Sequence, residues 1–159
     1  LVVQLFQDLY RLESFHIGVL GSVSFLGSAF FSIGLGRVGD KSGKMVAVTI
    51  ALLVGGFSFG LFICFNSFYA LIFASFLNGA SYMLWSLMGA SVGSITPEAS
   101  RGRWISVSQM SVTLAASIAP YIGGIMYESS SFTPFYIIIG VSPLLSLIAL
   151  TKPFKEERR

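Results

Sequence analysis

Five long apolar runs, separated by short charged segments, dominate the hydropathy pattern of this chain. They occupy residues 15–36, 45–65, 68–93, 104–127 and 134–150, and none of them contains Lys, Arg, Asp or Glu. A helix of about 20 residues rises roughly 30 Å, which is the thickness of the hydrocarbon core of a bilayer. The pattern therefore predicts an all-α integral membrane fold with five transmembrane helices, the last of them at the short end for a span.

The remaining residues divide the chain into three parts. Residues 1–14 mix apolar and charged positions, which indicates the end of a truncated helix followed by an outer loop. Residues 15–151 are expected to form the five-helix bundle, and residues 152–159 a basic cytoplasmic tail. Because Leu1 is not a start methionine and no signal peptide precedes the first run, we expect the chain to be a piece of a longer protein.

Composition supports lipid rather than water as the surroundings. Hydrophobic residues make up 54% of the 159 residues and charged residues 11%, whereas about one quarter of a soluble domain is charged. The net charge of +3 does not indicate a nucleic-acid partner, because no basic face survives between the apolar runs. The single Cys64 excludes an internal disulfide and a multi-cysteine metal site. We expect membrane lipid as a partner, and neither a cofactor nor a metal.

Basic residues collect on alternate connections between the runs. If the chain has five spans, nearly all Lys and Arg residues lie on one side of the membrane. The opposite side then carries a single basic residue, Arg11, together with the acidic residues Asp8, Glu13 and Glu128. Basic loops remain in the cytoplasm, so we expect a multi-pass cell-membrane protein with its N-terminus outside and its C-terminus in the cytoplasm. Nine of the ten Lys and Arg residues then lie on the cytoplasmic side: Arg37, Lys41, Lys44, Arg101, Arg103, Lys152, Lys155, Arg158 and Arg159.

The segment between the first two runs, residues 36–44, carries four charges in nine residues and predicts a tight cytoplasmic turn. Glycine permits the backbone dihedrals that such a turn requires. The segment resembles the signature loop of the major facilitator superfamily, a glycine followed by Asp-Arg/Lys-x-Gly-Arg/Lys. Met45 stands where the family pattern has a further basic residue. The matching residues are Gly36, Asp40, Lys41, Gly43 and Lys44, with Arg37 inside the motif.

Two further segments resemble the same family at the expected helix spacing. Pro97 and Glu98, followed by the Arg101-Gly102-Arg103 triplet, are similar to the family's cytoplasmic loop two helices later. The next span contains a proline-glycine motif that resembles the one in helices 5 and 11 of the family, and its proline predicts a bend. Its residues are Pro120, Gly123 and Gly124.

The resemblance implies a twelve-helix secondary transporter that moves a small-molecule substrate by alternating access. Ser75 stands where the N-terminal half of the family carries an arginine, four residues before Gly79, and the chain ends in a short basic tail. Both features favour the C-terminal half, helices 8–12 with the end of helix 7, and the missing N-terminal half is then a partner. The alternative is a non-transporting membrane receptor, scaffold or subunit that pairs with another membrane chain.

Two charged clusters are candidate functional sites at the cytoplasmic edge. In the family, the carboxylate of the signature loop is thought to latch the two halves together, and Asp40 occupies that position; the alternative is a solvated turn. Glu98, Arg101 and Arg103 form either an interfacial charge network that breaks and remakes or surface pairs of little energetic value.

A polar and aromatic face of the third run is the candidate substrate cavity. Asn78, Tyr82 and Trp85 lie at i, i+4 and i+7, on one face of a helix, and Gln109 and Thr113 of the fourth run are expected to join them. The alternative is helix packing, with the asparagine bonded to a neighbouring helix. Since no span carries a full charge, a neutral or hydrophobic solute, moved by efflux, is favoured over an ionic one. The residues form no catalytic pattern, so an enzyme is not expected.

Overall fold

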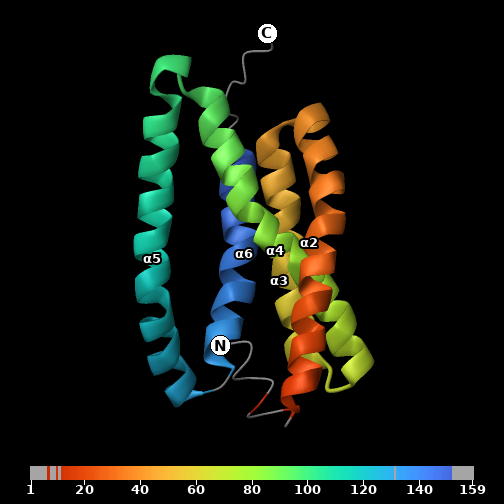
Figure 1. Cartoon of the computed structure of the whole chain (residues 1–159). Helices are drawn as coiled ribbons and strands as arrows, with labels where there is room; N and C mark the ends of the chain where they lie inside the picture. The colour runs from red at the N-terminus through yellow and green to blue at the C-terminus, as the bar shows by residue number, and fades with distance from the viewer. Residues whose placement is uncertain (1–6, 8–9, 11, 131, 152–159) are drawn as a thin grey trace.

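The computed structural model describes residues 7, 10, 12–130 and 132–151, and its regular elements in this part of the chain are all helices (Figure 1). The expected tail at residues 152–159 and most of residues 1–14 lie outside the described residues. The all-α architecture predicted from the apolar runs is confirmed. The elements in order are α2 (Ser14–Ser42), α3 (Lys44–Cys64), α4 (Phe68–Ile95), the short 3₁₀ helix η1 (Glu98–Ser100), α5 (Arg101–Ser129) and α6 (Thr133–Thr151).

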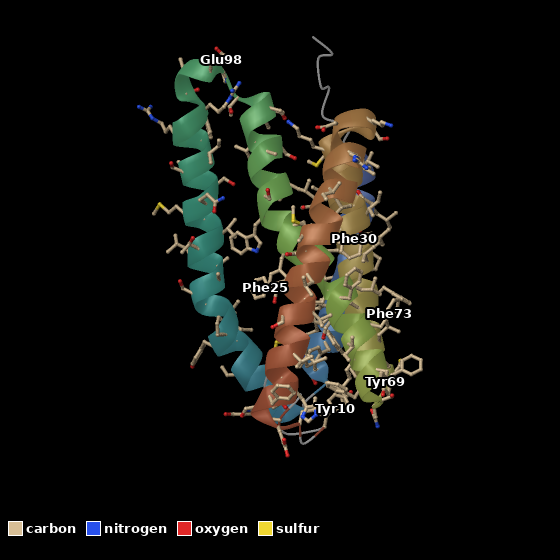
Figure 2. All side chains as sticks on the ribbon, turned by 45° about the vertical axis from the view of Figure 1, so that its right-hand side comes forward. Tyr10, Phe25, Phe30, Tyr69, Phe73 and Glu98 are labelled. Atoms are coloured by element: carbon tan, nitrogen blue, oxygen red, sulfur yellow. The ribbon has the colours of Figure 1, made fainter. Side chains whose placement is uncertain are left out.

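Four of these helices, α2 to α5, are long and apolar enough to cross a membrane. The apolar part of α6, Thr133–Ala149, is shorter, in line with its expected length at the lower limit of a span. Pro120 lies inside α5 and Pro143 inside α6. Figure 2 shows the C-terminal third of α5 inclined to the rest of that helix, the kind of bend that an internal proline produces.

The connection between α2 and α3 is tighter than the sequence suggested. The expected turn over residues 36–44 is wrong for most of its length, because α2 continues through the glycines and charged residues to Ser42. Only Gly43 leaves the helix, with φ 100° and ψ 144°, a conformation that residues with a side chain rarely adopt. Gly36 is helical. Polarity thus marks the edge of the apolar run, whereas the helix ends at Gly43, which has a positive φ.

A similar difference occurs between α4 and α5. A Thr-Pro pair such as Thr96-Pro97 is typical of a helix start, with the threonine as cap and the proline in the first helical position. Instead the Thr96 hydroxyl donates back to the carbonyl of Val92 at 2.8 Å, which closes the end of α4. Pro97 precedes η1, and α5 begins at Arg101.

Helix α4 is the centre of the bundle and crosses α2 at a point of very close approach. Gly27 of α2 faces the backbone of Phe76, and Gly79 of α4 faces the backbone of Ser28. A Cβ atom added to either glycine would overlap these main-chain atoms. The glycines allow the two backbones to approach this closely because they have no side chain. Such close packing stabilises helix pairs in a membrane, where the hydrophobic effect does not hold helices together.

Helix α3 also packs closely against two neighbouring helices through glycines. Gly55 lies against the Ser81 side chain of α4, and Gly56 lies against the Ser142 side chain of α6. The adjacent glycines point toward different helices because neighbouring residues on a helix are about 100° apart. Helix α3 therefore joins α4 to α6.

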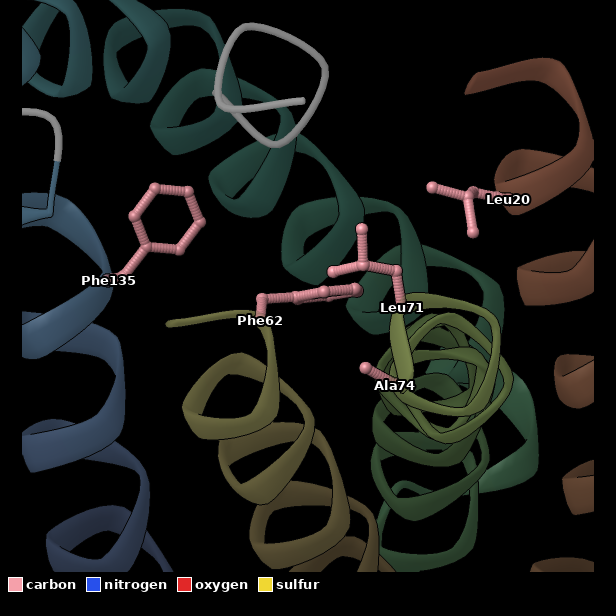
Figure 3. Packing of buried hydrophobic residues seen from close by; sticks show 5 residues of the cluster. All are labelled: Leu20, Phe62, Leu71, Ala74 and Phe135. Atoms are coloured by element: carbon pink, nitrogen blue, oxygen red, sulfur yellow. The ribbon is translucent and has the colours of Figure 1, made fainter. Parts of the chain in front are cut away.

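Two apolar clusters fill the two ends of this four-helix block. Figure 3 shows the first cluster, in which Phe62 of α3 points toward Leu71 of α4 while Leu20 and Phe135 approach from α2 and α6. Ala74 completes this cluster. The second cluster, near the α2–α3 connection, consists of smaller side chains from α2, α3 and α4: Leu35, Ala47, Val48, Ala51 and Leu87.

The phenol of Tyr10 ties the segment before α2 to the first cluster. Its hydroxyl donates to the carbonyl of Phe62, in the last turn of α3. Figure 2 shows Tyr10 at the lower end of the bundle. Burial, and to a smaller extent the nearby Cys64, raises the pKa of Tyr10. The contact closes the end of the block opposite the basic connections.

Most hydroxyl groups within the helices are satisfied locally. Each donates to a backbone carbonyl three or four residues earlier in its own helix, so it presents little free hydrogen-bonding capacity to its surroundings. These residues are Ser22, Ser24, Ser28, Ser32, Thr49, Ser58, Ser91, Ser94, Ser111, Thr113, Ser117, Ser142 and Ser146.

Candidate functional site

The two motif connections lie at the same end of the bundle, the upper end in Figure 1. Arg37, Asp40 and Lys41 lie on the last turns of α2, and all three side chains are exposed. Because this stretch is helical, the three charges project from a rigid helix end rather than from a flexible turn. We refer to this end of the molecule as the basic end.

Lys44 of the signature motif forms a hydrogen bond to another helix. Its ammonium group donates to the backbone carbonyl of Ala90 in α4 at 3.1 Å. A lysine on a carbonyl near the C-terminus of a helix also complements the negative end of the helix dipole. Gly43 and Lys44 together turn the chain and anchor the start of α3 to α4.

The second charged cluster lies at the same end, on η1 and the start of α5. Glu98, Arg101 and Arg103 are all exposed, and Figure 2 shows Glu98 at the very top of the molecule, away from the packed block. The structure thus places both clusters at one edge, as the alternation of basic connections suggested. A network among these side chains stays a prediction.

Asn78, Tyr82 and Trp85, which share one helix face, do not line a common cavity in the structure. Asn78 is only 8% exposed and lies inside the block, where the Ser58 hydroxyl of α3 is 3.5 Å from its Oδ1. That hydroxyl donates more closely, at 2.7 Å, to the carbonyl of Gly55. The geometry therefore favours helix packing, the alternative reading of Asn78, over contact with a solute.

Tyr82 follows the crossing of α2 and α4 and leans back on α2. Its ring stacks on Phe25 with the centroids 5.5 Å apart and an angle of 17° between the planes. Figure 2 shows Phe25 projecting from α2 into the space between α2 and α5. The two rings form an exposed aromatic surface on α2 and α4.

Trp85 and Gln109 come together in a groove between α4 and α5. The groove has a volume of about 160 Å³, and its remaining lining comes from Leu84, Met88, Gly89, Ser108 and Val112. The indole supplies a flat apolar face and the amide supplies a donor and an acceptor, while no lining residue is charged. Such a groove can hold an uncharged planar group by stacking and one or two hydrogen bonds.

Thr113 and the proline-glycine motif lie beside or beyond this groove. The hydroxyl of Thr113 donates to the carbonyl of Gln109 at 2.9 Å, so it supports its own helix. Pro120 is exposed, Gly123 is buried, and a Cβ on Gly124 would meet no atom within 4 Å. Gly124 therefore makes no close contact with another helix among the described residues.

Sequence reasoning missed the residues that complete the groove and the stack. Met88 follows Trp85 by three positions, so helical spacing could have placed it on the same face. Phe25 had no such signal, because only the crossing of α2 over α4 brings it to Tyr82. Among the described residues, no group of three His, Cys, Asp or Glu side chains is arranged to hold a metal.

A family model described as the Major Facilitator Superfamily matches residues 2–159. The chain belongs to the major facilitator superfamily, a family of membrane transporters. This match covers nearly all of the chain and confirms the resemblance that the three motifs carried.

Several characterised transporters are similar to the chain over much of its length. The vesicular acetylcholine transporter of Drosophila melanogaster is 30% identical over 122 residues, which is 74% of this chain and 21% of that protein. The tetracycline resistance protein, class B, of Escherichia coli is 24% identical over 122 residues, 77% of this chain and 30% of that protein. The gentisate transporter of Corynebacterium glutamicum is 26% identical over 141 residues, 86% and 31% respectively. The chain thus spans about a fifth to a third of these relatives.

Proposed function

We propose that the chain is the C-terminal half of a secondary transporter that moves a small solute by alternating access. The observation that carries the proposal is the groove in which Trp85 and Gln109 meet, on the side of α4 that faces α5. In secondary transporters the solute binds near the middle of the membrane between two bundles. The other bundle would be the N-terminal half, and it would cover the exposed side of α5.

The lining of the groove favours a neutral or hydrophobic solute, moved by efflux. An indole face and one amide select an uncharged planar or amphipathic molecule, and the apolar runs carry no carboxylate for a cation. The named relatives concern acetylcholine, tetracycline and gentisate, so family membership by itself does not select the solute.

The proposed orientation puts the basic end in the cytoplasm. The basic end carries Arg37, Lys41, Lys44, Arg101 and Arg103, and such a concentration of basic residues is typical of cytoplasmic connections. Asp40 would then act at the cytoplasmic edge as a latch between the halves. The chain by itself would not transport, because half of the solute site would be absent.

A matched pair of tryptophan substitutions tests the groove in the full-length protein. Trp85 and Trp104 are similarly exposed, at 47% and 53%, but only Trp85 lines the groove. We expect Trp85→Leu to lower tetracycline or Nile red transport in proteoliposomes about ten-fold, because base-type stacking on an aromatic face is worth roughly 1–3 kcal/mol. Trp104→Leu should transport like the unaltered protein.

The two variants also separate transport from folding. Both should keep the melting temperature of the unaltered protein, since neither indole is part of the packed block. Equal transport by Trp85→Leu and Trp104→Leu would remove the groove from the solute path. Transport by this chain alone would contradict the need for the other half.

A further inference from the structure

A second cavity lies next to the groove and shares part of its α4 lining. It occupies about 340 Å³ between α3, α4 and α6, near the basic end. Leu84 and Met88 line both spaces, so these two side chains separate the cavity from the Trp85 groove. The other lining residues are Met45, Val48, Leu52, Leu145, Ile148 and Ala149.

Every side chain that lines this cavity is apolar, and Leu145 and Ile148 of α6 are 46% and 56% exposed. Met88 is also 46% exposed, but it lines the Trp85 groove as well. In a membrane the two α6 side chains face lipid tails, so the cavity opens sideways into the hydrocarbon on the α6 side rather than into water. Its volume lies at the low end of the range for ligand sites, about 300–1,000 Å³, which suits a single hydrocarbon chain better than a bulky ligand.

A positive charge lies at the rim of the cavity on the basic end. Lys44 directly precedes the lining residue Met45, and its ammonium group is bound to Ala90, two residues beyond the lining residue Met88. This fixes the charge where α3 and α4 meet, one step toward the membrane surface from the apolar lining. Among the described residues the basic end carries Arg37, Lys41, Lys44, Arg101 and Arg103 against Asp40 and Glu98.

We propose that this cavity binds one anionic phospholipid from the leaflet at the basic end. One acyl chain fills the apolar cavity and the phosphate lies against Lys44. Basic residues beside a gap between membrane helices are the arrangement that selects anionic head groups. The two methionines adapt to a mobile chain because their side chains are unbranched and flexible. The assignment concerns lipid and does not depend on which solute is transported.

Native mass spectrometry of the full-length protein in detergent tests the site. Dioleoyl-phosphatidylglycerol and dioleoyl-phosphatidylcholine have the same chains and differ in the charge of the head group. We expect the protein to retain one tightly bound phosphatidylglycerol in preference to phosphatidylcholine. Lys44→Gln should reduce that preference about five-fold, the effect of one basic residue near the lipid surface, and Lys44→Arg should preserve it.

A pair of phenylalanine substitutions on α6 isolates the cavity from the surface charge. Ala149→Phe places a ring inside the cavity and should remove the bound lipid, whereas Leu147→Phe, on an exposed residue outside the lining, should retain it. Lys41→Gln is the matched control for charge, because Lys41 is exposed at the same end. Thermal unfolding of each variant checks that it is folded.

Three results would overturn the assignment. Equal binding of the two lipids by the unaltered protein would exclude selection by charge. Retention of the lipid by folded Ala149→Phe would place it elsewhere. A dimer that is lost in Ala149→Phe but present in Leu147→Phe would assign the cavity to a second copy of the chain.

Discussion

The block formed by α2, α3, α4 and α6 differs sharply from α5 in how its helices are packed. In α3, 44% of the apolar stretch is buried, against 6% in α5. All side chains from residue 109 to residue 122 of α5 are exposed, and Figure 1 shows this helix standing apart from α2 and α3. The helices of the block bury part of their surface against one another, whereas the middle of α5 has no face that the described residues cover.

The difference shows what holds membrane helices together. The block contains glycines that face a neighbouring helix at each crossing, and α5 has none of these contacts among the glycines with known surroundings: Gly102 and Gly124 have open space around them. Apolar side chains alone do not bring helices together in lipid, because lipid tails are equally apolar. Close packing therefore occurs where a glycine of one helix directly faces the backbone or a small side chain of another, and Gly102 and Gly124 of α5 make no such contact.

The largest effect is expected at the crossing of α2 and α4. Gly79→Ala would drive a methyl group into the backbone of α2, and overpacking of this kind typically costs about 1–3 kcal/mol or more. We expect the free energy of unfolding in detergent to fall by about 3 kcal/mol. The control is Gly124→Ala in α5, where a Cβ meets no atom within 4 Å and stability should rise slightly. Equal stabilities of the two variants would show that the crossing is not tightly packed.

Asn78 separates stability from transport within the block. Asn78→Ala removes a buried amide beside Ser58 and should lower the free energy of unfolding by about 1–2 kcal/mol. Transport per folded molecule should be unchanged, in contrast to Trp85→Leu. Asn66→Ala, at an exposed asparagine in the α3–α4 turn, is the control. A large loss of transport with unchanged stability would return Asn78 to the solute site.

Gly43 tests whether the connection between α2 and α3 depends on one backbone conformation. With φ 100° and ψ 144°, a conformation that side chains strongly disfavour, Gly43→Ala should cost about 1–3 kcal/mol, measured by chemical denaturation in detergent. Gly36→Ala is the matched control in the same motif: the residue is helical with open space around it, and alanine there should stabilise by about 0.5 kcal/mol. If both variants lose stability alike, the motif glycines have a role other than the turn.

Asp40 should have the smallest effect on stability. Its side chain is exposed at the end of α2, so Asp40→Asn should change the free energy of unfolding by less than about 0.5 kcal/mol. If Asp40 acts as a latch between the halves, the initial rate of transport in proteoliposomes should fall, and Asp40→Glu should restore part of it. Unchanged transport and unchanged populations of inward-open and outward-open states would remove the latch.

The sequence predicted the helices well because an apolar run long enough to span a bilayer has few alternatives. It misplaced the end of α2 because charge marks where a helix leaves lipid, whereas Gly43 marks where it stops. It also placed Asn78, Tyr82 and Trp85 on one functional face. Helix α4 crosses α2 at Gly79, so this face meets α3 before the crossing and α2 and α5 after it. Only the crossing, which depends on contacts between distant residues, could reveal that division.

The hydroxyl groups bonded within their own helices have a consequence for how the chain enters the membrane during synthesis. Helices α4 and α5 are less hydrophobic than α3, partly because of their serines and threonines. Ser91, Ser111 and Ser117 donate to carbonyls of the preceding turn and so bring few unsatisfied polar atoms into lipid. Each helix can therefore insert before its neighbours exist to shield it. For α5, which has few neighbours in this chain, insertion would then not have to wait for assembly.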